Sequence, residues 1–182
     1  MLATTHLLAV LLIIIVLNLD RYEALTVLTF GVFIDLDHLL AYPQYVSQAG
    51  WQNALNPDAA MTSGVAWKSI VHDPEFAMIV GPLSAGFRYA LPFLVWGLHL
   101  TMDWVQIDYL GVASPIEMGL ALGLLVAIAG LEYQKFRAVH PETEGLRSYI
   151  GWEKNRIVYV VRSGTRTVAD ILRPILPARV EA

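Results

Sequence analysis

The feature that most constrains the fold of this chain is a series of apolar runs that fills its first 135 residues. A helix needs about 20 predominantly apolar residues to cross the hydrocarbon core of a bilayer. Charged residues make up only 15% of the chain, against roughly 25% in a typical soluble domain, and the deficit is concentrated in these runs. The sequence therefore predicts an integral membrane protein.

We expect about five spans. The first three apolar runs cover residues 3–19, 24–40 and 76–105, and a fourth covers 115–136. The run 76–105 contains Pro82, Gly86, Arg88 and Pro92, which disfavour one long helix and place a charge at its centre. We therefore predict a hairpin with its turn near 84–88. The predicted fold class is all-α, a polytopic membrane helix bundle of about five spans with a C-terminal amphipathic helical tail.

The tail differs in character from the bundle. The predicted organisation is a transmembrane bundle over 1–137, with an extracytoplasmic loop over 41–71, and a cytoplasmic tail over 138–182. In the tail, apolar residues recur at helical spacing with arginines between them. Such a helix can lie on the membrane, contact a membrane protein partner, or pack on the protein's own surface. Gly164 and Pro174 are expected to break it.

Positive charge gives the predicted orientation. With five alternating spans, 11 of the 12 Lys and Arg residues face one side, and only Lys68 faces the other. Cytoplasmic loops carry the excess of Lys and Arg, so we expect a multi-pass protein of the cell membrane with a cytoplasmic C-terminus. The segment 1–19 has no preceding positive charge and no small-residue cleavage site, which favours a retained span over a signal peptide.

Composition excludes two classes of site. The chain has no cysteine, so it has neither disulfides nor thiolate metal ligands. Its net charge is −4 at pH 7, and nothing suggests a nucleic-acid partner. The lipid bilayer is the expected partner.

Histidine and aspartate gather at the ends of the predicted spans. With alternating spans, they all lie on the extracytoplasmic side of the membrane: His6, Asp35, Asp37, His38, His72, His99 and Asp103. His99 and Asp103 are spaced i, i+4, so both can face one ion from a single helix face. Imidazole and carboxylate together are the ligand set of zinc and similar divalent ions. The alternative to a metal site is that these are interfacial polar residues, hydrogen-bonded to one another at helix ends.

Asp35 and Asp37 stand on either side of Leu36. Where a helix unwinds at its end, this spacing can aim one carboxylate at a metal and leave the other beside it or as a base. We take Asp37 as the metal ligand and Asp35 as the candidate catalytic carboxylate. A carboxylate beside a metal can activate a bound water.

The order of these residues resembles the membrane-bound metal-dependent hydrolase family, also labelled LexA-binding, inner-membrane-associated hydrolases. The resemblance covers roughly 1–110: a histidine in the first span, Asp35-Leu36-Asp37-His38 ending the second, His72 opening the third, and Gly97-x-His99-x-x-x-Asp103 closing the fourth. That family looks like a membrane relative of zinc-dependent phospholipase C. The resemblance implies a main metal site of Asp37 (or Asp35), His72, His99 and Asp103, with His6 joining Asp103 at a second ion.

Two stretches depart from the family pattern. The family's His-Arg-Gly-x-Thr-His reads here Trp67-Lys68-Ser69-Ile70-Val71-His72, which loses one histidine. The Leu-Thr-Pro-x-Gly that follows the last Asp is replaced by residues 105–111.

Three functions compete. The first is a membrane-embedded metal-dependent hydrolase, with zinc as the expected cofactor, acting on a phosphoester that could be a lipid. The alternative is a non-catalytic accessory or structural subunit of a larger membrane complex, with a vestigial or structural metal site. An ion or proton pathway is the weakest, because the polar residues sit at one end and do not thread the spans.

Overall fold

The computed structural model describes residues 3–56, 59–60, 62–111, 114–142 and 145–172. Every regular element in these ranges is helical, which confirms the all-α class. The chain divides into two compact units, Met1–Gly130 and Leu131–Ala182. The predicted His/Asp cluster lies wholly in the first unit.

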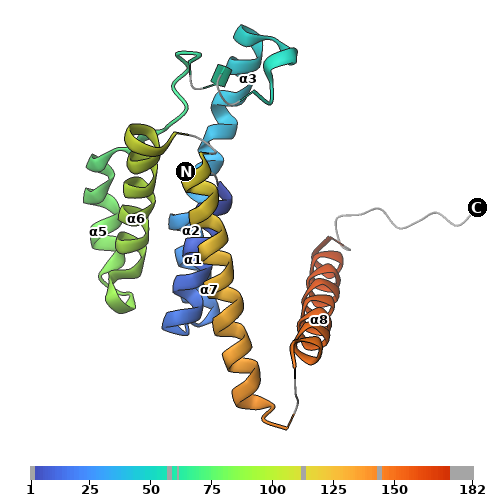
Figure 1. Cartoon of the computed structure of the whole chain (residues 1–182). Helices are drawn as coiled ribbons and strands as arrows, with labels where there is room; N and C mark the ends of the chain where they lie inside the picture. Colours follow the sequence, from blue (N-terminus) through green and yellow to red (C-terminus); the bar gives the residue numbers. More distant parts are fainter. Residues whose placement is uncertain (1–2, 57–58, 61, 112–113, 143–144, 173–182) are drawn as a thin grey trace, which may run out of the picture. The chain divides into compact units, whose positions relative to one another are not determined.

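Four helices form the body of the first unit: α1 (Ala3–Leu17), α2 (Arg21–Gly31), α5 (Ala77–Ser84) and α6 (Leu91–Val105). They run side by side in Figure 1, and α2 and α6 make the most extensive contact. A small apolar core of Val10, Val27, Leu91 and Val95 joins α1, α2 and α6. This packing holds together three helices that carry the polar cluster at one end.

The helices cross closely at Gly31. A Cβ atom at this position would stand 2.5 Å from the side chains of both Val10 and Val95. Only a residue without a side chain lets α1 and α6 approach α2 this closely.

The hairpin predicted over 76–105 is confirmed. A 3-10 helix η4 (Pro74–Phe76) leads into α5, and a turn followed by η5 (Arg88–Ala90) leads into α6. Arg88 donates hydrogen bonds to the Leu17 carbonyl and to the Glu23 carboxylate, so it joins this turn to the turn between α1 and α2. That second turn is closed by a capping box, in which Asp20 accepts from the backbone of Tyr22 and Glu23.

The second apolar run bends at the cluster. After α2 the chain passes through the 3-10 helix η1 (Phe33–Asp37) into α3 (His38–Ala49), with a bend of 49°. The break places both aspartates in a 3-10 turn.

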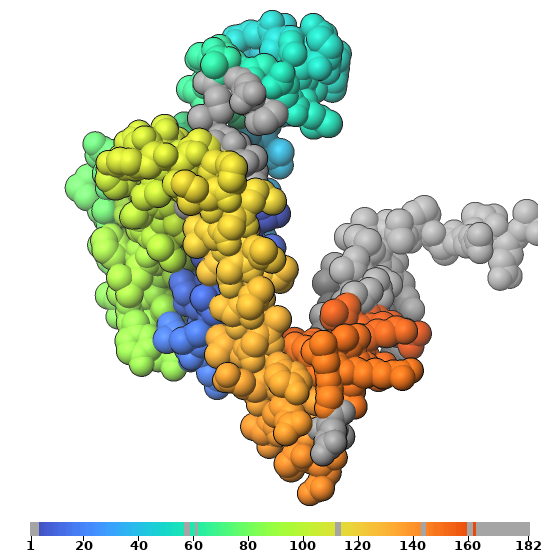
Figure 2. All heavy atoms as spheres, in the orientation of Figure 1, coloured from blue at the N-terminus to red at the C-terminus, as the bar shows by residue number. Residues whose placement is uncertain are grey.

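The segment 41–71, predicted as an extracytoplasmic loop, begins with the remainder of α3. Tyr42, Tyr45 and Val46 lie on α3 at helical spacing, and the last two pack with Val65 and Trp67 into a second small core. Together with η2 (Trp51–Asn53), the described residues of 41–67 form a lobe that projects from the end of the first unit (Figure 2). From this lobe the chain returns through the 3-10 helix η3 (Ile70–His72).

Five spans are not confirmed. Among the described residues, one helix is long and apolar enough to cross a membrane, α7 (Pro115–Val139), and the bent pair α2 and α3 would be a second if it is one span. The reason is length: α5 has eight residues, which rise about 12 Å against a hydrocarbon core of about 30 Å. The short helices are therefore apolar but not individually span-length.

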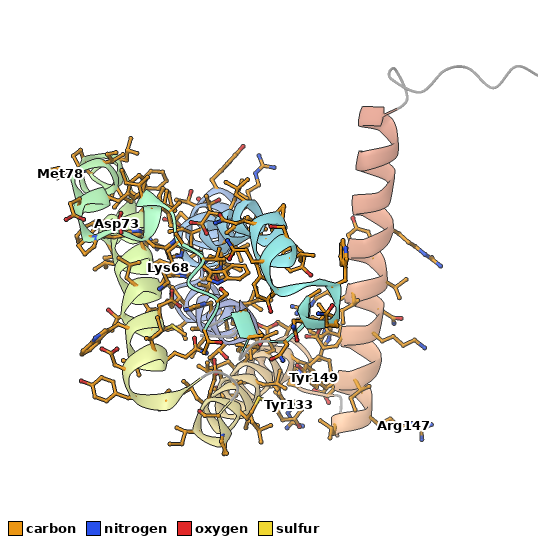
Figure 3. All side chains as sticks on the ribbon, turned by 90° about the horizontal axis from the view of Figure 1, so that it is seen from above. Lys68, Asp73, Met78, Tyr133, Arg147 and Tyr149 are labelled. Carbon is orange, nitrogen blue, oxygen red and sulfur yellow. The ribbon has the colours of Figure 1, made fainter. Side chains whose placement is uncertain are left out.

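The second unit contains the end of α7 and α8 (Leu146–Leu172). The predicted helical tail is confirmed to Leu172, and the break expected at Gly164 was wrong, because α8 runs through it. Pro174 and Ile175 lie outside the described residues. Aromatic side chains hold the two helices together: Tyr133 contacts Tyr149 (Figure 3). Phe136 contacts both Tyr149 and Trp152. Arg156 pairs with Glu132.

Candidate metal centre

Four side chains from three separate segments converge at one end of the first unit. Asp35 comes from η1, His72 from η3, and His99 and Asp103 from α6. One ligand atom from each lies within 4.8 Å of all the others. The convergence predicted for residues far apart in sequence is therefore present, and three of the predicted metal ligands, His72, His99 and Asp103, belong to this group.

Both histidines aim the same nitrogen at the centre of this group. His72 Nδ1 lies 3.0 Å from Asp37 Oδ2, and His99 Nδ1 lies 3.1 Å from the Gly31 carbonyl oxygen. Because these acceptors each take an N–H, the neutral form of each ring carries its proton on Nδ1 and directs its Nε2 lone pair into the cluster. The two Nε2 atoms face each other at 3.2 Å. In the neutral rings two facing lone pairs would repel, and either a proton on His72 or a bound cation removes that repulsion.

Asp35 completes the inner part of the cluster. Its Oδ1 lies 3.3 Å from His72 Nε2 and 3.2 Å from His99 Nε2. Asp103 Oδ2 lies 3.8 Å from His99 Nε2, on the same helix face, as the i, i+4 spacing predicted.

His6 lies beside the other oxygen of each of these two carboxylates. Its Nδ1 is 3.4 Å from Asp35 Oδ2, and its Nε2 is 3.5 Å from Asp103 Oδ1. Its ring stacks on that of His99 at 4.1 Å. The side chain is almost fully buried, and neither ring nitrogen makes a hydrogen bond within the described residues. Each carboxylate thus presents one oxygen to the His72–His99 pair and the other to His6.

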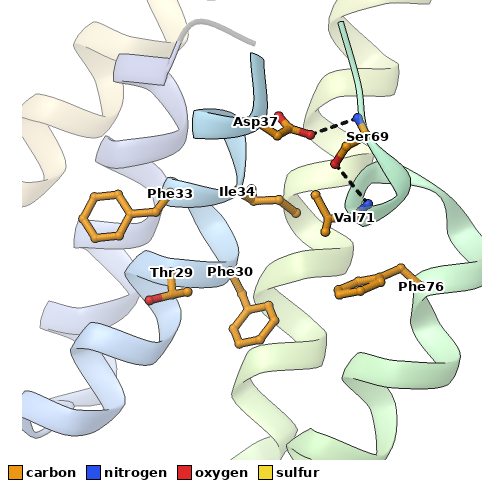
Figure 4. Close-up of a pocket in the computed structure, with 8 residues that line it drawn as sticks. All are labelled: Thr29, Phe30, Phe33, Ile34, Asp37, Ser69, Val71 and Phe76. Atoms are coloured by element: carbon orange, nitrogen blue, oxygen red, sulfur yellow. Dashed lines mark hydrogen bonds between the residues drawn. The ribbon is translucent and has the colours of Figure 1, made fainter. Parts of the chain in front are cut away.

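Asp37 stands outside the inner group. Besides orienting His72, its Oδ2 accepts the backbone N–H of Ser69 at 2.9 Å (Figure 4). A groove of about 310 Å³, mostly apolar and lined by Phe30, Ile34 and Phe76 among others, reaches this carboxylate. His38 is stacked on His72 at 5.3 Å, with its Nε2 3.8 Å from Asp37 Oδ1, so Asp37, His38 and His72 form a second, smaller donor group.

Charge around His72 favours its protonated form when no ion is present. Burial opposes protonation, but the hydrogen bond to Asp35 and the negative charge of Asp37 outweigh it, so the pKa of His72 is raised above its ordinary value. Lys68 offsets part of the negative charge, with its Nζ 2.7 Å from Asp103 Oδ2.

Sequence reasoning missed the residues that support the cluster. Glu117, in the first turn of α7, is fully buried and accepts hydrogen bonds from Thr5, next to His6, and from Gln106, one turn beyond Asp103. The signal for Glu117 was a lone carboxylate at the start of an apolar run, which is a functional candidate by default. The role of Gly31 left no such signal, because it depends on which helices cross there.

No family model matches this sequence, and no curated protein or solved structure matches it. The assignment of function therefore has to come from the geometry of the site.

Proposed function

We propose that this chain is a metal-dependent hydrolase of the membrane, with a zinc-type ion held by Asp35, His72, His99 and Asp103. The observation that carries the proposal is the pair of facing Nε2 atoms, each oriented by a hydrogen bond at Nδ1 of the same ring. Histidines that ligate metals are oriented in this way, by a carboxylate or a backbone carbonyl.

The donor spacing supports the choice of ion. Ligands about 2.0–2.1 Å from a tetrahedral zinc lie about 3.3–3.4 Å from one another. The separations among Asp35 Oδ1, His72 Nε2 and His99 Nε2 are 3.2–3.3 Å. Asp103 requires a small movement, because its nearest oxygen is 3.8 Å from His99 Nε2.

This geometry favours Asp35, rather than Asp37, as the metal ligand. Asp35 lies among the donors, whereas Asp37 is one hydrogen bond away and holds His72 in place. His6 faces the outer oxygens of Asp35 and Asp103, so these two carboxylates can bridge to a second ion that His6 helps to hold.

A bound ion would supply an activated water and would neutralise charge developing on phosphate oxygens. The chain's own groups provide the rest. With a single ion bound, Asp35 Oδ2, the oxygen that faces His6, is placed to accept a proton, and the burial of His6 and His99 keeps bulk water away. A phosphoester is the substrate class that suits a site rich in carboxylate and imidazole ligands.

The distribution of polarity supports a membrane location. Side chains on the outer surfaces of α5 and α7 are apolar and exposed, among them Met78, Leu83, Leu122 and Val126, whereas Thr5, His6, His99 and Glu117 are buried. Lipid is the environment in which such an arrangement is stable. We further propose several spans, with the cluster extracytoplasmic and the Arg88 turn cytoplasmic. A label at residue 88 should react only from the cytoplasmic side; reaction from outside would invert the orientation.

Metal analysis of the purified full-length chain tests the proposal. We expect about one or two zinc ions per chain, which His99→Ala should reduce to near zero, while His140→Ala, a histidine of the second unit, leaves the content unchanged. Because ion binding must displace the proton on His72, whose pKa is raised, affinity should begin to fall at a pH above the ordinary histidine value of about 6.5 and should continue to fall below it. A phosphodiesterase assay on the metal-loaded protein then tests hydrolysis. A wild-type chain without metal would end the proposal.

One observation favours the alternative, a non-catalytic subunit of a membrane complex. Trp67, which replaces a histidine of the resembling family, belongs to the core of the lobe, where its ring contacts Tyr45 at 5.1 Å and its indole N–H donates to the Ala60 carbonyl. Metal binding without turnover of any phosphoester would support this alternative.

A further inference from the structure

Lys68 forms an ion pair with one carboxylate of the proposed metal centre. It belongs to the segment that descends from the lobe, and its ammonium group lies 2.7 Å from Asp103 Oδ2. That oxygen is the one that Asp103 turns toward His99. Lys68 therefore forms an ion pair with the carboxylate oxygen that would coordinate a metal ion.

Beside this contact the surface is hollowed. A groove of about 440 Å³ has Lys68 and His72 among its lining residues, and much of its wall is apolar, formed by Leu100, Trp104 and Ile107 of α6 and η6 (Gln106–Leu110). Asp108 also lines it and is its acidic member. In Figure 3, Lys68 is seen from above, close to α6. The groove thus joins one cationic group, one edge of the metal centre and an apolar wall.

We propose that Lys68 is the phosphate-binding residue of this groove, and that the ligand is an amphiphile with a single phosphate group and an apolar chain. The inference rests on the proposed function. Without the ion, Lys68 neutralises Asp103. When an ion takes that oxygen, the ammonium group is released and remains beside the groove, because its flexible stem is 37% exposed.

The ion-free and ion-bound states of the cluster differ in charge, and the ion-bound state is the one that favours an anionic phosphate. Three aspartates, Asp35, Asp37 and Asp103, make the ion-free cluster anionic and repel a phosphate. With Asp103 ligating an ion, Lys68 has no equivalent carboxylate at 2.7 Å and can donate to a phosphate oxygen in a charge-assisted hydrogen bond. Asp108 disfavours a second phosphate, and Trp104, which is half-exposed, offers a flat apolar contact for the chain.

Binding of phosphonates, whose C–P bond resists hydrolysis, tests the inference on the zinc-loaded full chain. We expect Lys68→Met to weaken the binding of both methylphosphonate and octylphosphonate by about tenfold or more, the scale of one charge-assisted hydrogen bond. Lys68→Arg should restore most of it, and Lys154→Met, on α8, should have no effect. Trp104→Ala should weaken octylphosphonate alone, which separates an amphiphile from free phosphate.

Zinc affinity provides a second readout that does not depend on turnover. Because Lys68 competes with the ion for Asp103, Lys68→Met should bind zinc several-fold more tightly than the wild type. If Lys68 only formed a structural ion pair, its loss would weaken zinc binding and leave phosphonate binding unchanged. Either of these results would overturn the inference about Lys68. Neither would contradict the proposed metal centre. Equal effects of Trp104→Ala on both phosphonates would overturn the proposal that the ligand is an amphiphile. A wild-type chain that binds no zinc would overturn both the inference and the proposed function.

Discussion

Gly31 links the packing of three helices to the orientation of a candidate ligand. Its missing side chain allows α1, α2 and α6 to meet, and its carbonyl oxygen fixes the Nδ1 proton of His99. A single residue thus sets both the distance between helices and the direction of a lone pair.

We predict that Gly31→Ala destabilises the fold by about 1–3 kcal/mol, the usual cost of overpacking a well-filled core. The new methyl group would stand 2.5 Å from two β-branched side chains, which cannot rotate away easily. Thermal unfolding in detergent measures the loss. Gly97→Ala, also on a helix, is the matched control, because nothing lies within 4 Å of its Cβ position. Equal melting temperatures for the two variants would contradict the prediction.

The sequence pattern alone does not assign separate roles to the two aspartates of η1. Asp35 and Asp37 are equivalent in the sequence, and either could ligate. The 3-10 turn and the approach of η3 separate them: Asp35 Oδ1 meets both Nε2 atoms, while Asp37 bonds Ser69 and the outer nitrogen of His72. Their roles depend on a segment more than 30 residues away.

At the scale of elements, Glu117 ties the start of α7 to two helices that carry the cluster. It accepts from Thr5 of α1 through one oxygen and from Gln106, which follows α6, through the other. A carboxylate placed between two buried donors fixes α1 and α6 relative to each other.

We predict that Glu117→Ala lowers the stability of the first unit by about 2–6 kcal/mol, since two buried donors would lose their acceptor at about 1–3 kcal/mol each. Zinc affinity should fall with it, because His6 and Asp103 lie close to the two donors. Glu117→Gln keeps the shape and one acceptor oxygen, so its effect should be smaller. Calorimetry with a parallel zinc titration checks both, and an unchanged melting temperature in Glu117→Ala would show that α7 does not support the cluster.

At the scale of the whole molecule, the division into two units separates the cluster from the tail. The donors all precede Gly130, whereas the aromatic contacts of α8 are made with the end of α7. Basic residues on α8 include Arg147, Lys154 and Arg162. Near an anionic membrane surface each can contribute about 1 kcal/mol.

Truncation after His140 should therefore leave the zinc content unchanged and reduce the anionic lipid that the protein retains through purification. Mass spectrometry of bound lipid and metal analysis measure the two quantities on the same sample. A truncated chain that still inserts in the membrane but has lost its metal would show that the tail belongs to the site.

The sequence by itself determined the helical class, the hairpin over 76–105, the helical tail and the set of residues that meet. It could do so because apolar periodicity, breaking residues and the alternation of helix direction are local properties or follow from them. The lobe at 41–67, the roles of Asp35 and Asp37, the contact of Lys68 with Asp103 and the supports at Gly31 and Glu117 came only with the tertiary structure. Each depends on which side chains from distant segments share a space of a few ångströms, and that is set by packing, which no local pattern records.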